Sequence, residues 1–179
     1  DEARELIERV KRVLDRVREE NTRVNKELHD ILRRVEKRNR DLLRELREIL
    51  KDVKKKADEV REDKEVLRKL LKEVEKALRR VKEESDRSLK EVRDAVEEVK
   101  RISDTSLDKV RKVLEDAKRA VKDSRELEKE LRRLIAEVAR IVEESRRNLE
   151  RIEEAIKRIS ETSEKEIREI EDRIKKDVD

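Results

Sequence analysis

The chain has 179 residues, of which 58% are charged, and it contains no Gly, Pro, Cys, Met, Phe, Tyr or Trp. Its 54 basic and 50 acidic side chains give a net charge of only +4. Without cysteine, disulfides, thiol nucleophiles and thiolate metal sites are excluded. No apolar run approaches the roughly 20 residues that span a bilayer. We therefore expect a soluble protein without a membrane role, and we predict no cellular location.

The apolar residues are Leu, Ile, Val and Ala, and they follow the period of a helix rather than that of a strand. They occupy about three positions in every two turns, which makes an apolar face wide enough for two neighbouring helices. The high charge content alone would permit disorder, but a disordered chain does not need an ordered apolar stripe. The sequence therefore predicts an all-α protein.

The first predicted helix, approximately residues 2–61, carries an apolar template that repeats every 18 residues. Eighteen residues make five whole turns, so equivalent positions point the same way and the helix is expected to be nearly straight. Two asparagines, Asn21 and Asn39, stand where the template requires an aliphatic side chain. The first copy of the template consists of Ala3, Leu6, Ile7, Val10, Val13, Leu14 and Val17.

The second predicted helix, approximately residues 64–121, restarts the template at Leu67 with a shifted phase. One continuous helix cannot carry this shift, so we place a turn near residues 61–63. Asp63 is the expected N-cap, with Glu65 in the first turn, where the helix dipole favours a carboxylate.

A second phase break predicts a third helix, approximately residues 125–178, with Ser124 as its N-cap. Neither turn contains glycine, so we expect an Asp or Lys to adopt a left-handed backbone conformation. Three helices of similar length joined by short turns predict a single-chain, antiparallel (up-down-up) long three-helix bundle. This bundle would be a single domain covering residues 1–179.

Polar residues interrupt the apolar stripes at heights that match once the chain has folded back twice. Asn21 should lie level with residues near 103 and 145, and Asn39 with residues near 86 and 163. We predict two structural polar layers that fix helix register and pairing, because a slipped bundle would leave their polar atoms unsatisfied at roughly 1–3 kcal/mol per group. The first layer consists of Asn21, Asn25, Ser103, Ser106, Ser145 and Asn148, and the second of Asn39, Ser85, Ser88, Ser160 and Ser163.

The polar layers have an alternative interpretation as a small-ligand or water site, but the register role is preferred. Asn and Ser cannot run proton chemistry unaided. His29 is the only imidazole, so a multi-histidine metal site or a Ser–His–Asp triad has one candidate. We expect it to be a solvated or boundary histidine that touches the first polar layer. The sequence therefore predicts no enzyme, metal, cofactor or small-molecule substrate.

The densest basic segment, Arg33–Arg40, could contact phosphates in a salt-dependent way. The chain has no aromatic side chain to stack on bases, and neighbouring acidic residues dilute the positive field. We therefore predict no nucleic-acid partner. Because two sister helices account for the apolar stripe, we also predict no lipid partner.

Together these features resemble a computationally designed (de novo), parametric three-helix bundle with buried hydrogen-bond networks. The resemblance covers all 179 residues and rests on the 18-residue template, the Glu/Lys/Arg surface, the missing aromatics and the Asn and Ser insertions. It implies a monomeric structural scaffold without a natural biochemical function. The alternative is a subunit of a designed helical hetero-oligomer or switch, whose mass in solution would be a multiple of 21.7 kDa.

Overall fold

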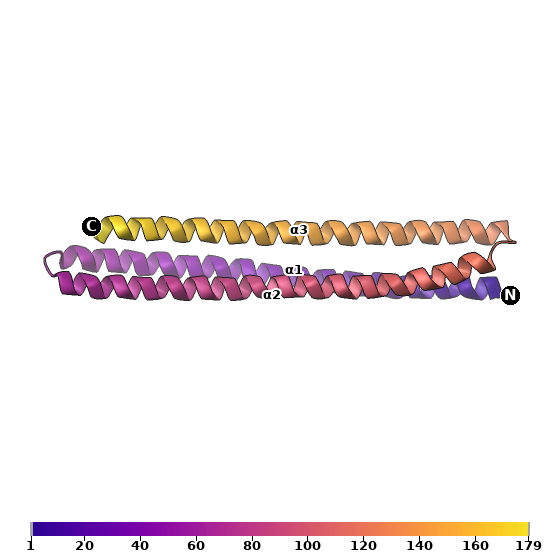
Figure 1. The fold of residues 1–179 in the computed structure, drawn as a ribbon, viewed down its shortest axis with the longest axis horizontal. Coiled ribbons are helices and arrows are strands. Elements are labelled where there is room, and N and C mark those ends of the chain that lie inside the picture. Colours follow the sequence, from indigo (N-terminus) through magenta and orange to yellow (C-terminus); the bar gives the residue numbers. More distant parts are fainter. Residues whose placement is uncertain (1, 179) are drawn as a thin grey trace. The chain divides into compact units, whose positions relative to one another are not determined.

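The computed structural model describes residues 2–178, with the side chains of Lys175, Asp177 and Val178 left aside. It contains three helices, α1 (Glu2–Glu59), α2 (Lys64–Ala120) and α3 (Arg125–Val178), and no strand occurs among these residues (Figure 1). The helices pack against each other as an all-α, antiparallel three-helix bundle. The predicted fold class is confirmed.

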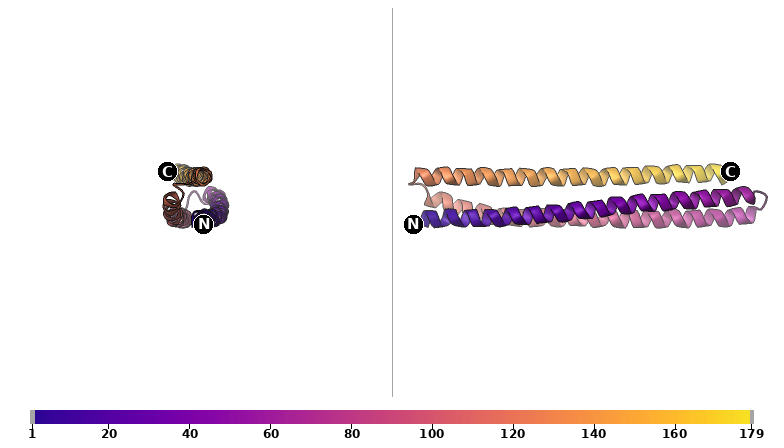
Figure 2. Two further views of the ribbon diagram at one scale, coloured as in Figure 1. Left: turned by 90° about the vertical axis from the view of Figure 1, so that its right-hand side faces the viewer. Right: turned by 180° about the vertical axis from the view of Figure 1, so that it is seen from behind.

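Two four-residue turns, Val60–Asp63 and Val121–Ser124, connect the helices (Figures 1 and 2). They share one backbone hydrogen-bond pattern, in which the fourth amide donates to the first carbonyl. The bond is 3.0 Å from Asp63 N to Val60 O and 3.2 Å from Ser124 N to Val121 O. No residue of the described chain has a positive φ. The expected left-handed Asp or Lys is therefore wrong, because a turn of this kind closes with negative φ at both central residues.

Asp63 caps α2, as predicted. Its carboxylate Oδ1 accepts hydrogen bonds from the amides of Glu65 at 3.2 Å and Val66 at 3.5 Å. Its carbonyl accepts the first helical bond, from Leu67 N at 3.2 Å. At the second turn the Ser124 carbonyl likewise accepts from Glu128 N at 3.0 Å. The cap side chain thus satisfies two amides that the start of α2 leaves without helical partners.

The chain divides into two compact units, and each unit contains one part of every helix. Unit 1 comprises Asp1–Asp30 and Asp94–Glu153, and unit 2 comprises Ile31–Arg93 and Glu154–Asp179. The predicted single domain stays a prediction.

Each unit has its own apolar core, to which all three helices contribute through the stripe positions of the template. These side chains are aliphatic throughout, so the burial of apolar surface is the main stabilising contribution in both units. The buried core of unit 1 consists of Ile7, Val10, Leu14, Val110, Leu114, Ala117, Val121, Leu131 and Leu134. That of unit 2 consists of Leu42, Leu43, Leu46, Val74, Leu78, Val81, Ile167, Ile170 and Ile174.

Candidate functional site

A small cavity in unit 1 brings together residues of the predicted first polar layer from all three helices. Asn21 of α1, Ser103 and Ser106 of α2, and Ser145 of α3 line it, and its volume is about 20 Å³. The rest of its wall is largely apolar and consists of Val17, Glu20, Val24, Ile102, Leu107, Ile141 and Val142. Four of the six predicted first-layer residues therefore lie around one cavity.

Two hydroxyl groups at this cavity differ in whether they have a hydrogen-bond partner. Ser106 Oγ donates a hydrogen bond to Glu20 Oε2 at 3.3 Å. Ser145 is only 8% exposed, and its Oγ has no hydrogen-bond partner among the protein atoms described. Glu20 was not predicted as a member of this site, although its place directly before Asn21 puts it beside the layer. The cavity therefore combines one engaged carboxylate with one buried, unpaired hydroxyl.

The other two first-layer residues, Asn25 and Asn148, lie near the only histidine. His29 Nε2 is 2.9 Å from Asn148 Oδ1. An amide oxygen only accepts, so His29 donates this bond through Nε2–H. The buried atoms Asn148 Nδ2, a donor, and Asn25 Oδ1, an acceptor, have no partner in the described part of the chain. One buried donor and one buried acceptor of the predicted first layer are thus unpaired among the described protein atoms.

The predicted second layer lies in unit 2, where Asn39, Ser85 and Ser163 are buried to 4%, 5% and 5% exposure. Ser88 and Ser160 are half-buried. Neither Asn39 Nδ2 nor Asn39 Oδ1 has a hydrogen-bond partner among the described protein atoms. Asn39 and Ser163 line an open groove of about 260 Å³ together with Glu36, Arg40, Leu43, Arg158, Ile159 and Thr162. The structure therefore brings Asn39 of α1 and Ser163 of α3 to one groove.

None of the eleven predicted layer residues is fully exposed, since four are buried and seven are half-buried. Burial of so many short polar side chains in aliphatic cores is costly unless they are hydrogen-bonded. Their role in fixing register is not established by burial alone and stays a prediction.

Charged pairs between α1 and α3 follow the same 18-residue repeat as the apolar template. In unit 1, Lys11 Nζ lies 2.5 Å from Glu130 Oε1. In unit 2, Arg47 Nη2 lies 2.6 Å from Glu166 Oε2. His29 lies 18 residues after Lys11 and 18 before Arg47. Asn148 lies in the same way between Glu130 and Glu166, so the His29–Asn148 pair occupies the repeat between the two ion pairs. These charged pairs were not predicted from the sequence, although the 18-residue template reveals them when it is applied to charged positions.

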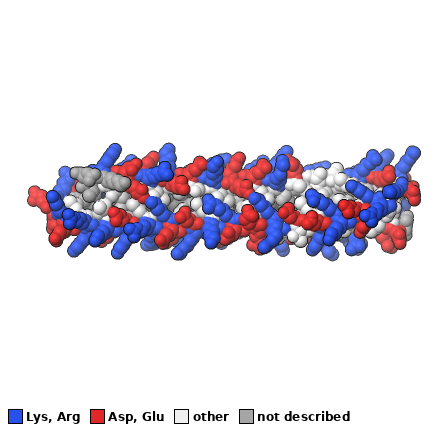
Figure 3. Space-filling model, in the orientation of Figure 1, with Lys and Arg blue, Asp and Glu red and all other residues white. Residues whose placement is uncertain are grey.

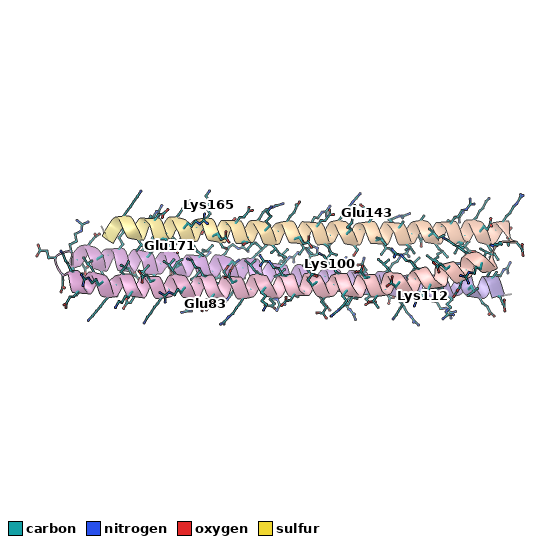
Figure 4. The ribbon with its side chains drawn as sticks, in the orientation of Figure 1. Glu83, Lys100, Lys112, Glu143, Lys165 and Glu171 are labelled. Carbon is teal, nitrogen blue, oxygen red and sulfur yellow. The ribbon has the colours of Figure 1, made fainter. Side chains whose placement is uncertain are left out.

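Charged pairs between α2 and α3 show that these two helices run in opposite directions. Lys100 Nζ lies 2.6 Å from Glu153 Oε1 in unit 1, and Lys82 Nζ lies 2.5 Å from Glu171 Oε1 in unit 2. A step of 18 residues back along α2 thus matches a step of 18 residues forward along α3. Figure 4 labels Lys100 of the first pair and Glu171 of the second.

Two of these contacts raise the pKa of a lysine. The hydrogen bond to Glu130 raises the pKa of Lys11 above its ordinary value, against the opposing effect of desolvation. The hydrogen bond to Glu153 raises the pKa of Lys100 in the same way. Both shifts favour the charged form of a surface lysine, and neither is the kind of perturbation that creates a general acid or base near neutral pH.

One face of the protein carries both signs of charge in close alternation. Figure 3 shows Lys and Arg side chains interspersed with Asp and Glu over the face that it draws. No group of three or more His, Cys, Asp or Glu side chains that could hold a metal ion occurs among the described residues. Within the same residues, no helix combines the length and apolarity that crossing a membrane requires.

Residues 35–172, more than half of the chain, match the model of the LXG domain of the WXG superfamily. No curated protein and no solved structure matches the chain. The family match overturns the expectation of a de novo designed scaffold without a natural function, and with it the alternative of a designed hetero-oligomer subunit. That expectation failed because an 18-residue apolar repeat follows from helix geometry, which natural and designed bundles share.

The LXG domain is not a known family of enzymes. The matched residues include most of unit 2 and parts of all three helices. They also include all five predicted residues of the second polar layer. The chain belongs to the LXG domain family of the WXG superfamily.

Proposed function

We propose that the chain is a non-enzymatic helical domain of a natural, toxin-related protein of the WXG type. The family match supports the natural origin and the type of protein. The site supports the absence of catalysis, because the one histidine donates to an amide oxygen and the charged pairs join surface side chains. In this proposal the domain acts through its fold and needs no cofactor or small-molecule substrate.

One observation carries the proposal that the domain folds without a partner. Ile49, at 37% exposure, is the one large hydrophobic side chain that is exposed among the residues described. A subunit that needs another chain to fold leaves a contiguous apolar patch when it is alone. Here the three helices cover one another's apolar stripes within each unit. We therefore propose a monomer that requires no protein, nucleic-acid or lipid partner to fold.

Light scattering over a wide range of protein concentration tests this proposal. A constant mass near 21.7 kDa is the expected result. A mass that rises to a multiple of this value with concentration would overturn the proposed monomer. The match to the LXG family does not depend on the outcome.

The proposal also gives the polar layers a role, namely to select one helix register among several that the repeating apolar template permits. An apolar stripe that repeats still packs well when one helix shifts along its neighbour. A polar residue that occurs once per layer does not, because the shift moves it away from its polar partners. Asn39 and Ser163, which line one groove in unit 2, support this role for the second layer.

Distance measurements between spin labels test the register role directly. Labels at Arg44→Cys and Lys165→Cys, two exposed positions of unit 2, report how α1 sits against α3. The protein with its layer intact is expected to give one narrow distance. With the buried layer side chains replaced together (Asn39→Leu, Ser85→Ala and Ser163→Ala), a second or broader distance is expected while the protein stays helical.

The matched control replaces three exposed residues of the same helices, Asp41→Ala, Arg87→Ala and Thr162→Ala, and should keep the single distance. One unchanged, narrow distance in the variant without the layer would refute the register role.

A further inference from the structure

We propose that the outer side of α1 in unit 2 is a docking surface for the anionic headgroups of a lipid bilayer. The surface is a row of exposed basic side chains, which we name the basic stripe. It consists of Arg33, Lys37, Arg40, Arg44, Arg47 and Lys51. The contact is ionic and peripheral, so it goes beyond the proposed function, under which the protein folds without a partner.

Helix geometry places the basic stripe on one line. Successive residues turn by about 100°, so spacings of three and four residues keep all six side chains within about 40° of a common direction. From Arg33 to Lys51 the line is about 27 Å long at 1.5 Å per residue. The acidic residues of this segment all lie outside that sector, and they are Glu36, Asp41, Glu45 and Glu48. They therefore flank the basic stripe and do not interrupt it.

Most of the basic stripe has no counter-charge within the protein. Of its six side chains, Arg47 alone has an ion-pair partner in the described part of the chain, Glu166 of α3, and Arg47 is still 58% exposed. Arg158 of α3 adds a positive charge beside the stripe, because it lines the same groove as Arg40. Glu36 is the single acidic residue of that groove. The stripe therefore presents its charges to an external anion.

The basic stripe does not follow from composition alone. Along α3 in the same unit, an exposed line at similar spacing carries three acidic and three basic residues, namely Glu154, Lys157, Glu161, Lys165, Arg168 and Asp172. Unit 2 has 30 basic and 25 acidic residues, a net charge of +5, whereas unit 1 has 24 basic and 25 acidic residues, a net charge of −1. The positive excess of the chain thus lies in unit 2, and the stripe gathers it on one side of α1.

A flat anionic surface matches this arrangement of charges better than a nucleic acid or a peptide does. All side chains on a straight line can reach a plane at once. The phosphates of a duplex wind around its axis, so a straight helix meets each strand at only a few points. The chain has no aromatic side chain to stack on the bases of a single strand. Peptide interfaces are anchored by aromatic or aliphatic side chains in pockets, and the stripe contains none.

Ionic binding of this kind is reversible and depends on salt. Each Lys or Arg side chain close to an anionic membrane strengthens binding by about fivefold, and the attraction falls off over a Debye length of about 8 Å at physiological salt. We expected no lipid partner because the apolar stripe is buried. That argument excludes the insertion of an apolar face into a bilayer, but it does not apply to a contact made by charge alone.

Flotation with lipid vesicles tests the proposal. Vesicles of phosphatidylcholine with phosphatidylserine should bind the protein at physiological salt and release it at high salt, whereas vesicles of phosphatidylcholine alone should not bind it. Neutralising four residues of the stripe should lower the partition coefficient by about a hundredfold or more, at about fivefold per substitution. The four substitutions are Arg33→Gln, Lys37→Gln, Arg40→Gln and Arg44→Gln.

The matched control removes the same charge from exposed positions of α2 and α3 in unit 2, with Arg79→Gln, Arg87→Gln, Lys157→Gln and Arg168→Gln. This variant should keep most of the binding, and circular dichroism should show both variants to be as helical as the unmodified protein. An equal loss of binding in the two variants would show that net charge and not the stripe holds the membrane, and would overturn the proposal.

The unmodified protein provides a test that needs no variant, because a failure to bind vesicles that contain phosphatidylserine would also overturn the proposal. A labelled DNA duplex and a polyglutamate peptide, measured at the same salt, represent the other occupants. Binding of either one that requires the stripe, without binding to vesicles, would assign the stripe to that class of partner and reject the bilayer.

Discussion

His29 Nε2 lies 2.9 Å from Asn148 Oδ1, at a place where the preceding copy of the 18-residue repeat has an ion pair between Lys11 and Glu130. The polar pair therefore replaces a charged one at the height of the first polar layer. This replacement lowers stability, because the buried Nδ2 of Asn148 has no acceptor among the described protein atoms.

Replacing the pair by charges, His29→Lys together with Asn148→Glu, should stabilise the protein by at least about 1 kcal/mol. The change removes an unpaired buried donor, worth roughly 1–3 kcal/mol, and adds a surface ion pair worth about 0–1 kcal/mol. The site accepts a carboxylate, since Glu130 at the equivalent position is 40% exposed. Urea unfolding measures the effect.

The reverse exchange, Lys11→His with Glu130→Asn, is the matched control and should lower the free energy of unfolding. If both exchanges changed stability in the same direction, the equivalence of the two positions would be wrong.

Asn39→Leu should raise the free energy of unfolding by about 1–3 kcal/mol, because it removes two buried polar atoms that lack partners. The adjoining groove leaves space for the larger side chain. Guanidinium unfolding gives the value. Asn21→Leu, at a half-buried position, is the comparison and should raise the free energy of unfolding by less. A destabilised Asn39→Leu protein would mean that the amide is satisfied in solution.

The stability of the protein should fall as the pH rises above the ordinary pKa of lysine, 10.5. The folded-state pKa of Lys11 and of Lys100 is raised by the hydrogen bonds to Glu130 and Glu153. The stabilising contribution of each pair is thus fully present below the unfolded-state pKa and is lost as the pH passes through the folded-state pKa.

Unfolding by urea at pH values below and above 10.5 tests this expectation for Lys11→Gln with Lys100→Gln. The double variant should lose less stability across the range than the unmodified protein does. Lys165→Gln, an exposed lysine of α3, serves as the control. An identical pH dependence in all three proteins would contradict the prediction.

Asp63→Ala should destabilise the protein by about 1 kcal/mol, since the amides of Glu65 and Val66 lose the carboxylate that caps α2. Thermal unfolding followed by circular dichroism measures the loss. Glu62→Ala, one residue earlier in the same turn, should have little effect. Equal effects of the two substitutions would show that Asp63 acts through charge alone rather than as a cap.

The sequence predicted the helices, the position of both turns and the cap at Asp63 because these depend on local periodicity and on single side chains. It did not predict the backbone of the turns, since glycine-free turns were assumed to need a left-handed residue. It also did not predict the cavity at Ser145 or the unpaired amide of Asn39, because both depend on how three helices pack at one height. The origin of the protein was predicted wrongly, since periodicity reports helix geometry and not ancestry.

The turns themselves have a consequence for how such a chain can evolve. Because every described residue keeps a negative φ, the central turn residues Arg61, Glu62, Lys122 and Asp123 face no stereochemical demand for one amino-acid type. Mutational drift at these four positions can proceed without disturbing the helices on either side. The turns are therefore the natural places for relatives to diverge, and for grafted sequences to be accepted.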